Sequence, residues 1–152
     1  MPRNTGKKDR DVKPITETYA VSPQISPDDI AGIKAAGYTT VICNRPDAEV
    51  PPGQQAADLR AAAEAAGLTF VENPFSHAAF GMELVDRQME ALEAAEGPVF
   101  AYCASGNRCT VLWALGQVRE GAVSPDEAIG TAAQQGYDLS GLRPQLEAVA
   151  PA

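Results

Sequence analysis

Cys103 begins a short segment, CASGNR, that combines a thiol, a glycine and an arginine. The segment follows the apolar run PVFAY and precedes the helix-like stretch CTVLWALGQV. A strand, a glycine-containing loop and a helix in this order can bind an anion, because backbone N–H groups converge at the helix N-terminus. These donors and the nearby Arg108 are expected to lower the pKa of the Cys103 thiol. The pattern therefore predicts a nucleophilic thiolate at neutral pH.

The other residues of the loop have distinct expected roles. Gly106 allows the tight turn that aims the amides inward, and Arg108 can hold an oxyanion with paired N–H donors. Cys109 has two interpretations: it intercepts a persulfide or resolves an oxidised Cys103, or it is a small packing residue. The predicted catalytic residues are Cys103 and Arg108, and the predicted substrate-binding residues are Ala104, Ser105, Gly106, Asn107 and Cys109.

Strand-like and helix-like segments alternate along the chain. Strands are expected at 18–25, 39–44, 68–71 and 98–103, and helices at 27–36, 51–66, 82–96, 108–120, from 124 onward and at 140–149. Two Ser-Pro-Asp-acidic capping boxes, beginning at Ser26 and Ser124, support two of the helix starts. This alternation predicts an α/β fold with three layers: a mostly parallel sheet of four to five strands between helices.

Two other loops should border Cys103, because ligands of such sheets bind at the carboxyl ends of the strands. One loop carries Arg45 and Asp47, which either serve an anionic substrate or only stiffen the turn. The other carries His77, a possible proton donor on a surface loop. A phosphatase would need a carboxylic acid to protonate its leaving group, and the sequence does not rank the three candidates. These are Asp47, Glu72 and Asp138.

Composition narrows the class of protein. The chain has 152 residues and a net charge of −8, with five basic residues in a leader predicted at 1–14. We expect that leader to be flexible and residues 15–152 to form one domain. The acidic domain argues against nucleic acid as a partner, and no apolar run predicts a membrane span or a secretory signal. A cytoplasmic location is therefore expected. The three cysteines and single histidine show no zinc-site spacing, so we predict no metal and no cofactor.

The segment YCASGNRC resembles the active-site loop of bacterial rhodanese domains, in which a cysteine of the pattern Cys-x-x-Gly-x-Arg takes up sulfane sulfur. Residues 16–146 are similar to the DUF442, or β-lactamase hydrolase-like, family of small phosphatase-like proteins. The segments that carry this match are YAVSPQIS, TTVICNRPDAE, YCASGNR, LWALGQ and GYDLSGLRP. The resemblance implies a fold like that of dual-specificity cysteine phosphatases. It also implies a possible partner, since the family is found fused to a persulfide-processing metallo-β-lactamase-fold domain.

Three functions follow as hypotheses. Cysteine phosphatases use Cys-x5-Arg, whereas this loop has four intervening residues. The shorter loop favours a sulfurtransferase that forms a Cys103 persulfide from a small anionic sulfane donor and passes the sulfur to an acceptor thiol. The alternative is a cysteine-dependent phosphatase with a phosphocysteine intermediate. The third hypothesis is a non-catalytic module that binds an anion or a protein partner, or senses redox state.

Overall fold

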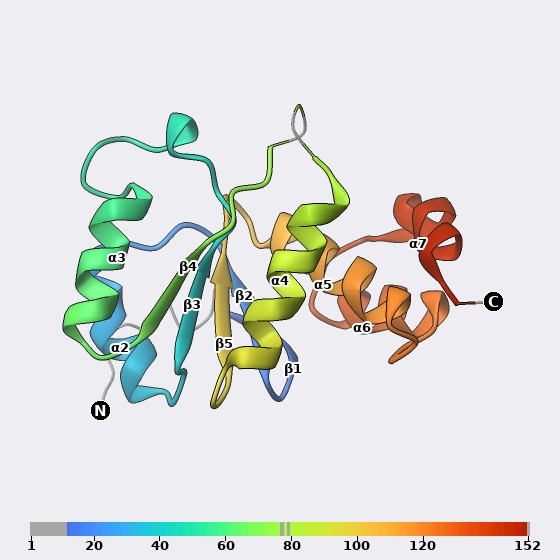
Figure 1. Ribbon diagram of the computed structural model, residues 1–152, viewed down its shortest axis with the longest axis horizontal. Coiled ribbons are helices and arrows are strands. Elements are labelled where there is room, and N and C mark those ends of the chain that lie inside the picture. The colour runs from blue at the N-terminus through green and yellow to red at the C-terminus, as the bar shows by residue number, and fades with distance from the viewer. Residues whose placement is uncertain (1–11, 77, 79, 152) are drawn as a thin grey trace.

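The computed structural model describes residues 12–76, 78 and 80–151. Its five-stranded sheet has the order β1-β2-β5-β3-β4. The strands are β1 (Lys13–Thr16), β2 (Tyr19–Ser22), β3 (Thr40–Cys43), β4 (Thr69–Glu72) and β5 (Val99–Tyr102). Strand β1 pairs antiparallel with β2, and all other pairs are parallel. The α/β class with a mostly parallel sheet is confirmed (Figure 1).

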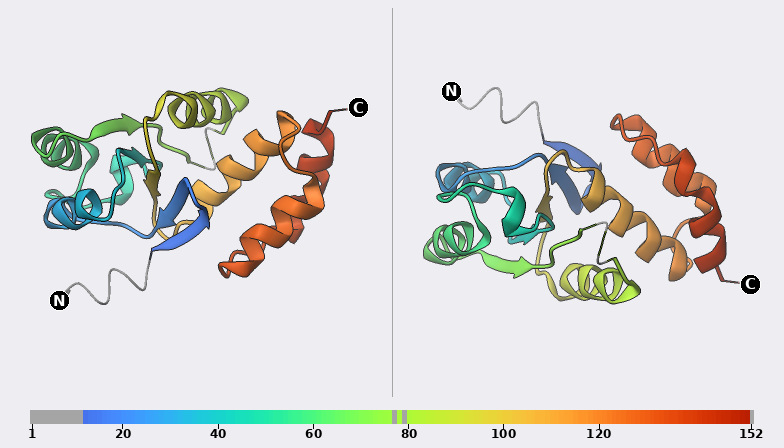
Figure 2. Two further views of the ribbon diagram at one scale, coloured as in Figure 1. Left: turned by 90° about the horizontal axis from the view of Figure 1, so that it is seen from below. Right: turned by 90° about the horizontal axis from the view of Figure 1, so that it is seen from above.

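Helices cover both faces of the sheet, which gives the predicted three layers (Figure 2). One core cluster joins α2 (Ile30–Ala35) and α3 (Ala56–Ala65) to Val41 and Phe100. The other joins α4 (Met82–Ala94), α5 (Asn107–Arg119), α6 (Pro125–Gln134) and α7 (Arg143–Val149) to Ile42 and Ala101. Neighbouring residues of one strand point to opposite faces, so Val41 and Ile42 belong to different clusters. Helices α6 and α7 pack on α5 and form an outer layer (Figure 1).

Several boundaries differ from the sequence predictions. Strand β1 begins at Lys13, inside the segment predicted as a leader. It was not predicted because KPIT is short and follows a charged segment without a clear apolar pattern of its own. Helix α3 begins five residues later than predicted, at Ala56. Pro51 and Pro52 lack the backbone N–H that a helix needs beyond its first turn, and Gly53 has φ +100°. The remaining leader, residues 1–11, lies outside the described residues.

Short 3-10 turns precede two of the other helices. They are η1 (Pro27–Asp29) before α2 and η4 (Ser140–Leu142) before α7, while η2 (Asp47–Glu49) lies in the loop after β3. Ser26 and Asp29 form the first predicted capping box, and Ser124 and Glu127 form the second. No helix of the described residues is both long and apolar enough to cross a membrane.

Candidate active site

The Cys103 loop connects β5, a central strand, to the N-terminus of α5. The backbone N–H of Cys103 donates to the Ser22 carbonyl of β2 at 3.2 Å, which fixes the start of the loop to the sheet. Gly106 is the N-cap of α5 and has φ +96°, a conformation that L side chains rarely adopt. The sequence prediction of a strand, a tight glycine turn and a helix is therefore confirmed in the structure.

The Cys103 thiol lies at the floor of this loop and is only 1% exposed. Hydrogen bonds lower its pKa to about 5: first from the Cys109 side chain, then from the backbone N–H groups of Cys109, Ser105 and Gly106. The Gly106 N–H lies 3.1 Å from Sγ. These donors outweigh burial, which acts in the opposite direction. Cys103 is thus a thiolate at neutral pH, as a nucleophile requires.

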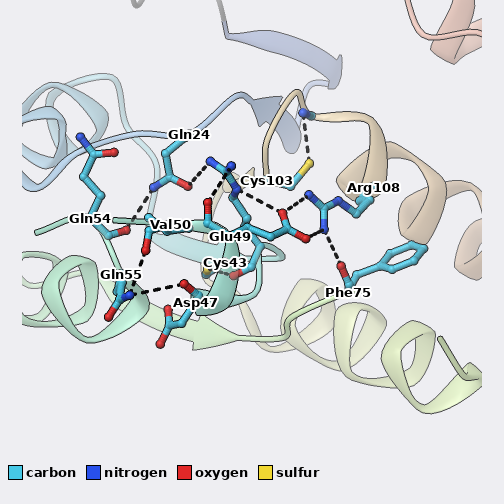
Figure 3. Close-up of polar contacts among 12 residues, drawn as sticks. Gln24, Cys43, Asp47, Glu49, Val50, Gln54, Gln55, Phe75, Cys103 and Arg108 are labelled. Carbon is cyan, nitrogen blue, oxygen red and sulfur yellow. Dashed lines mark hydrogen bonds and ion pairs between the residues drawn. The ribbon is translucent and has the colours of Figure 1, made fainter. Parts of the chain in front are cut away.

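Arg108 approaches the loop but is held by other partners (Figure 3). Its Nη2 and Nη1 donate to the Glu49 carboxylate at 2.7 and 3.1 Å, and Nη1 also donates to the Phe75 carbonyl at 2.7 Å. These contacts tie α5 to the loops after β3 and β4. Arg108 and Cys103 still interact electrostatically, since the thiolate helps to raise the pKa of the guanidinium. The oxyanion-binding role of Arg108 stays a prediction.

Arg108, Glu49 and Arg45 form a cluster of charged side chains beside the Cys103 loop. Glu49 was not among the site residues predicted from the sequence. It also accepts a hydrogen bond from Arg45 Nε at 3.3 Å, and Arg108 is the main cause of the lowered pKa of its carboxyl. The spacing of Arg45 and Glu49, four residues apart, was the available signal. Asp47 instead accepts the Ala56 N–H at 2.8 Å and so supports the start of α3. Arg45 thus contacts the carboxylate that holds Arg108, whereas Asp47 is engaged elsewhere, and a role of either residue toward an anionic substrate stays a prediction.

A buried network of side-chain amides supports the loops after β3 and β4. The sequence analysis did not predict this network. Gln88 of α4 exchanges hydrogen bonds with Asn44, at the end of β3, and accepts one from Asn73, at the end of β4. Its Nε2 also donates to the Tyr19 hydroxyl at 3.0 Å, and that hydroxyl donates to the Cys109 carbonyl at 2.8 Å. The network therefore reaches the first turn of α5. An asparagine just after each of two strands, in VICN and FVEN, was the sequence signal.

Cys109 lies against Cys103 and is fully buried. Burial and the neighbouring Cys103 raise the pKa of the Cys109 thiol well above its usual value, so it remains protonated and can donate to the thiolate. Cys109 is the sixth residue after Cys103, the place at which a Cys-x5-Arg loop carries its arginine. Both earlier interpretations of Cys109 remain compatible with this position.

The remaining predicted residues lie apart from the thiolate or at its rim. Ala104, Ser105 and Asn107 are exposed, although the backbone N–H of Ser105 reaches the thiolate. The Asp138 carboxylate accepts two hydrogen bonds from Ser140, which lower its pKa. Glu72 lies 4.0 Å from the Arg60 guanidinium. His77 lies outside the described residues. Within the part of the chain that the structure describes, no group of three or more His, Cys, Asp or Glu residues could hold a metal ion.

Comparison with known proteins connects this geometry to one family. Residues 11–120 match the model of the phosphatase-like domain of the β-lactamase hydrolase-like protein. A β-lactamase hydrolase-like protein of Xylella fastidiosa is 34% identical over 131 residues, which cover 82% of this chain but only 29% of that relative. The chain therefore spans less than a third of the length of this relative.

Solved structures share the fold over nearly the whole chain. A Neisseria meningitidis protein proposed to be a phosphatase is 33% identical, with a TM-score of 0.78 and coverage of 90% of this chain and 96% of that one. TpbA of P. aeruginosa, solved in complex with phosphotyrosine, is 18% identical, with a TM-score of 0.61 and coverage of 97% and 94%. These similarities favour the phosphatase alternative over the sulfur transfer expected from the loop length.

Proposed function

Because the chain belongs to the family of β-lactamase hydrolase-like, phosphatase-like domains, we propose that it is a cysteine-dependent phosphatase acting on phosphate monoesters. One observation carries the proposal: the Cys103 thiol, with a pKa of about 5, receives backbone N–H donors at the N-terminus of α5. The same donors that stabilise a thiolate can stabilise the charge on a phosphoryl group. TpbA supports phosphotyrosine-like esters as the substrate class, since that protein of similar fold was solved with phosphotyrosine.

The reaction requires two displacements at phosphorus. Cys103 Sγ attacks the phosphorus in line, an S–P bond forms and the P–O bond to the alcohol or phenol breaks. Water then attacks the phosphocysteine, releases inorganic phosphate and restores the thiolate. The loop amides and Arg108 would hold the equatorial oxygens through both steps.

The leaving group narrows the expected substrates. Asp138 has a lowered pKa and is ionised at neutral pH, Glu72 faces Arg60, and Asp47 accepts the Ala56 N–H, so none of the three candidates is a good proton donor. An aryl phosphate leaves as a phenolate with a pKa near ~10, far below that of an alkoxide, and needs the least protonation. We therefore propose aryl phosphates as better substrates than alkyl phosphates.

Sulfur transfer stays a second candidate because of the loop. Four residues, and not five, separate Cys103 from Arg108, and Cys109 takes the place of the usual arginine. In this reaction Sγ attacks the outer sulfur of thiosulfate, an S–S bond forms and sulfite leaves with the electron pair of the broken bond. A metallo-β-lactamase-fold protein as a downstream partner is likewise a proposal.

The proposal is tested by incubating the protein with p-nitrophenyl phosphate and, separately, with thiosulfate. We expect hydrolysis of the phosphate ester and a transient phosphoryl group on Cys103, detected by intact mass after acid quench. Cys103→Ser should reduce kcat/KM by about a thousandfold or more, since the nucleophile is lost.

Cys43→Ser is the matched control, because Cys43 is also a buried cysteine at the end of a strand but lies in the opposite core cluster. It should retain activity. The phosphatase proposal fails if the protein does not hydrolyse the ester but gains one sulfur from thiosulfate on Cys103. If neither reaction occurs, the non-catalytic hypothesis replaces both.

A further inference from the structure

The peptide group that joins Ser105 to Gly106 is hydrogen-bonded on both sides. Its N–H donates to Cys103 Sγ at 3.1 Å, and its carbonyl accepts the Tyr137 hydroxyl at 2.9 Å. Tyr137 follows α6, outside the region 11–120 that matches the family model. A residue of the C-terminal helical layer therefore reaches the active-site loop.

We propose that Tyr137 is a positioning residue that holds the Ser105–Gly106 peptide with its N–H directed at the Cys103 sulfur. A trans peptide is planar, and its C=O and N–H point in opposite directions, so fixing one end fixes the other. The hydrogen bond to the carbonyl also polarises the peptide and strengthens its N–H as a donor. Tyr137 thereby stabilises the thiolate without touching it.

The fit between Tyr137 and Gly106 supports this role. A Cβ atom on residue 106 would lie 2.2 Å from the Tyr137 hydroxyl oxygen, so the two residues can be this close only because position 106 is glycine. Burial raises the pKa of Tyr137 to about 12, which keeps its hydroxyl protonated wherever Cys103 titrates. The tyrosine is thus a donor over the whole working range of the loop.

The backbone around Tyr137 is itself anchored. Its N–H donates to the Ala132 carbonyl at 3.0 Å, and the preceding Gly136, two residues after the end of α6, turns the chain with φ +92°. Ala128 and Ala132 are fully buried in the core cluster that contains α5. Packing of α6 on α5 therefore holds the Tyr137 hydroxyl in place.

The test compares wild type with Tyr137→Phe, which removes only the hydroxyl. Alkylation of Cys103 by iodoacetamide is followed by peptide mass spectrometry across pH 4–9, and its midpoint gives the pKa of the thiol. We expect a rise of about 0.5 to 1 unit, which slows alkylation at pH 5 roughly two- to fivefold and leaves it unchanged at pH 8. A purely structural role would not produce this pH-dependent difference.

Tyr38→Phe is the matched control, because Tyr38 is also partly buried but packs edge-on against Phe100 on the other face of the sheet. Its midpoint should equal that of wild type. If Tyr137→Phe does not fold, Tyr137→Leu provides the same measurement. An unchanged midpoint in a folded Tyr137 variant overturns the proposal. Alkylation needs no substrate, so this result is independent of whether the protein is a phosphatase.

Discussion

Arg108 is positioned by the groups on its outer edge. Glu49 and the Phe75 carbonyl take three of its five N–H donors, and in the view of Figure 3 Cys103 lies on another side of the guanidinium. Among the described residues, its Nε–H and its second Nη2–H have no hydrogen-bond partner. These two donors form one edge of a planar fork, which suits two oxygens of a phosphoryl group.

Replacing Arg108 by lysine keeps the charge and removes the fork. We expect kcat/KM for p-nitrophenyl phosphate to fall about a hundredfold, since a positioned transition-state donor is lost. The alkylation midpoint of Cys103 should change little, because the main causes of its low pKa are Cys109 and the loop amides.

Arg143→Lys is the control for this change. Arg143 also pairs with a carboxylate, Asp126, but on an exposed surface of the C-terminal helices, so the exchange should leave activity intact. Equal activity of Arg108→Lys and wild type would show that Arg108 does not bind the reacting group.

For single residues, the sequence indicated Cys103 as a candidate nucleophile and Gly106 as the turn residue. It did not indicate Glu49 and Tyr137, which contact the loop from other elements. A thiol, a glycine and an arginine within one loop are adjacent in the chain and can be recognised together. Glu49 lies 59 positions from Arg108, and Tyr137 lies 32 positions from Ser105. The spacing of Arg45 and Glu49 hints at their own pair, but only the packing of the elements brings Glu49 to Arg108 and Tyr137 to Ser105.

Among the elements, α4 has the least obvious connection to the site, yet Gln88 makes it the centre of the amide network. The side-chain amides of Gln88, Asn44 and Asn73 satisfy one another in the buried layer between α4 and the carboxyl ends of β3 and β4. The bordering loops therefore start from fixed positions, although they contain little regular structure themselves. Buried polar groups of this kind stabilise only when every partner is present.

We expect Gln88→Leu, which is similar in volume, to destabilise the fold by about 3 kcal/mol. The change leaves the buried Asn44 Oδ1 without a partner, and it removes one hydrogen bond each from Asn44 Nδ2, Asn73 Nδ2 and the Tyr19 hydroxyl. Urea unfolding followed by circular dichroism measures the loss. The same change at Gln134, exposed on α6, should shift stability by less than about 0.5 kcal/mol. A Gln88→Leu protein as stable as wild type would contradict the importance of the network.

The elements themselves were largely predictable. The strands expected at 39–44, 68–71 and 98–103 appear as Thr40–Cys43, Thr69–Glu72 and Val99–Tyr102. Apolar, β-branched runs between glycine and proline signals are strong patterns, and the serine capping boxes mark helix starts. Strand β1 was missed because it is stabilised by pairing with β2 and not by its own sequence.

For the molecule as a whole, the low pKa of Cys103 links function to stability. The folded thiol has a pKa of about 5, whereas an unfolded cysteine titrates near ~8.5. Between these values the unfolded chain holds a proton that the folded protein has released. The thiolate therefore stabilises the fold fully above the unfolded value, and this contribution is lost as the pH falls through the folded value.

Comparing wild type with Cys103→Ser tests this linkage. The difference in unfolding free energy should rise with pH by up to ~1.4 kcal/mol per unit between about 5 and 8.5. Cys43→Ser should show no such rise between about pH 5 and 7.5, because burial raises the pKa of folded Cys43 and the thiol is protonated in both states over that range. Parallel pH profiles for wild type and Cys103→Ser would contradict the low pKa in the folded state.

The global fold was predictable from the alternation of strands and helices, whereas the reaction was not. Loop length alone favoured sulfur transfer, and whole-chain similarity favours a phosphatase. A one-residue difference in loop length does not alter the alternation of strands and helices from which the fold was predicted. The choice between sulfur transfer and phosphate hydrolysis therefore depends on the detailed geometry of the Cys103 loop, which the pattern of apolar and polar residues does not determine.

The burial of Cys103 separates ionisation from accessibility. Because only 1% of the residue is exposed, we expect a narrow group to reach the sulfur more readily than a wide one. Small reagents such as hydrogen peroxide or iodoacetamide should therefore react with the thiolate at neutral pH faster than bulky aromatic disulfides do. Access to the sulfur, together with its acidity, is then expected to decide which oxidants, inhibitors and covalent probes compete with substrate.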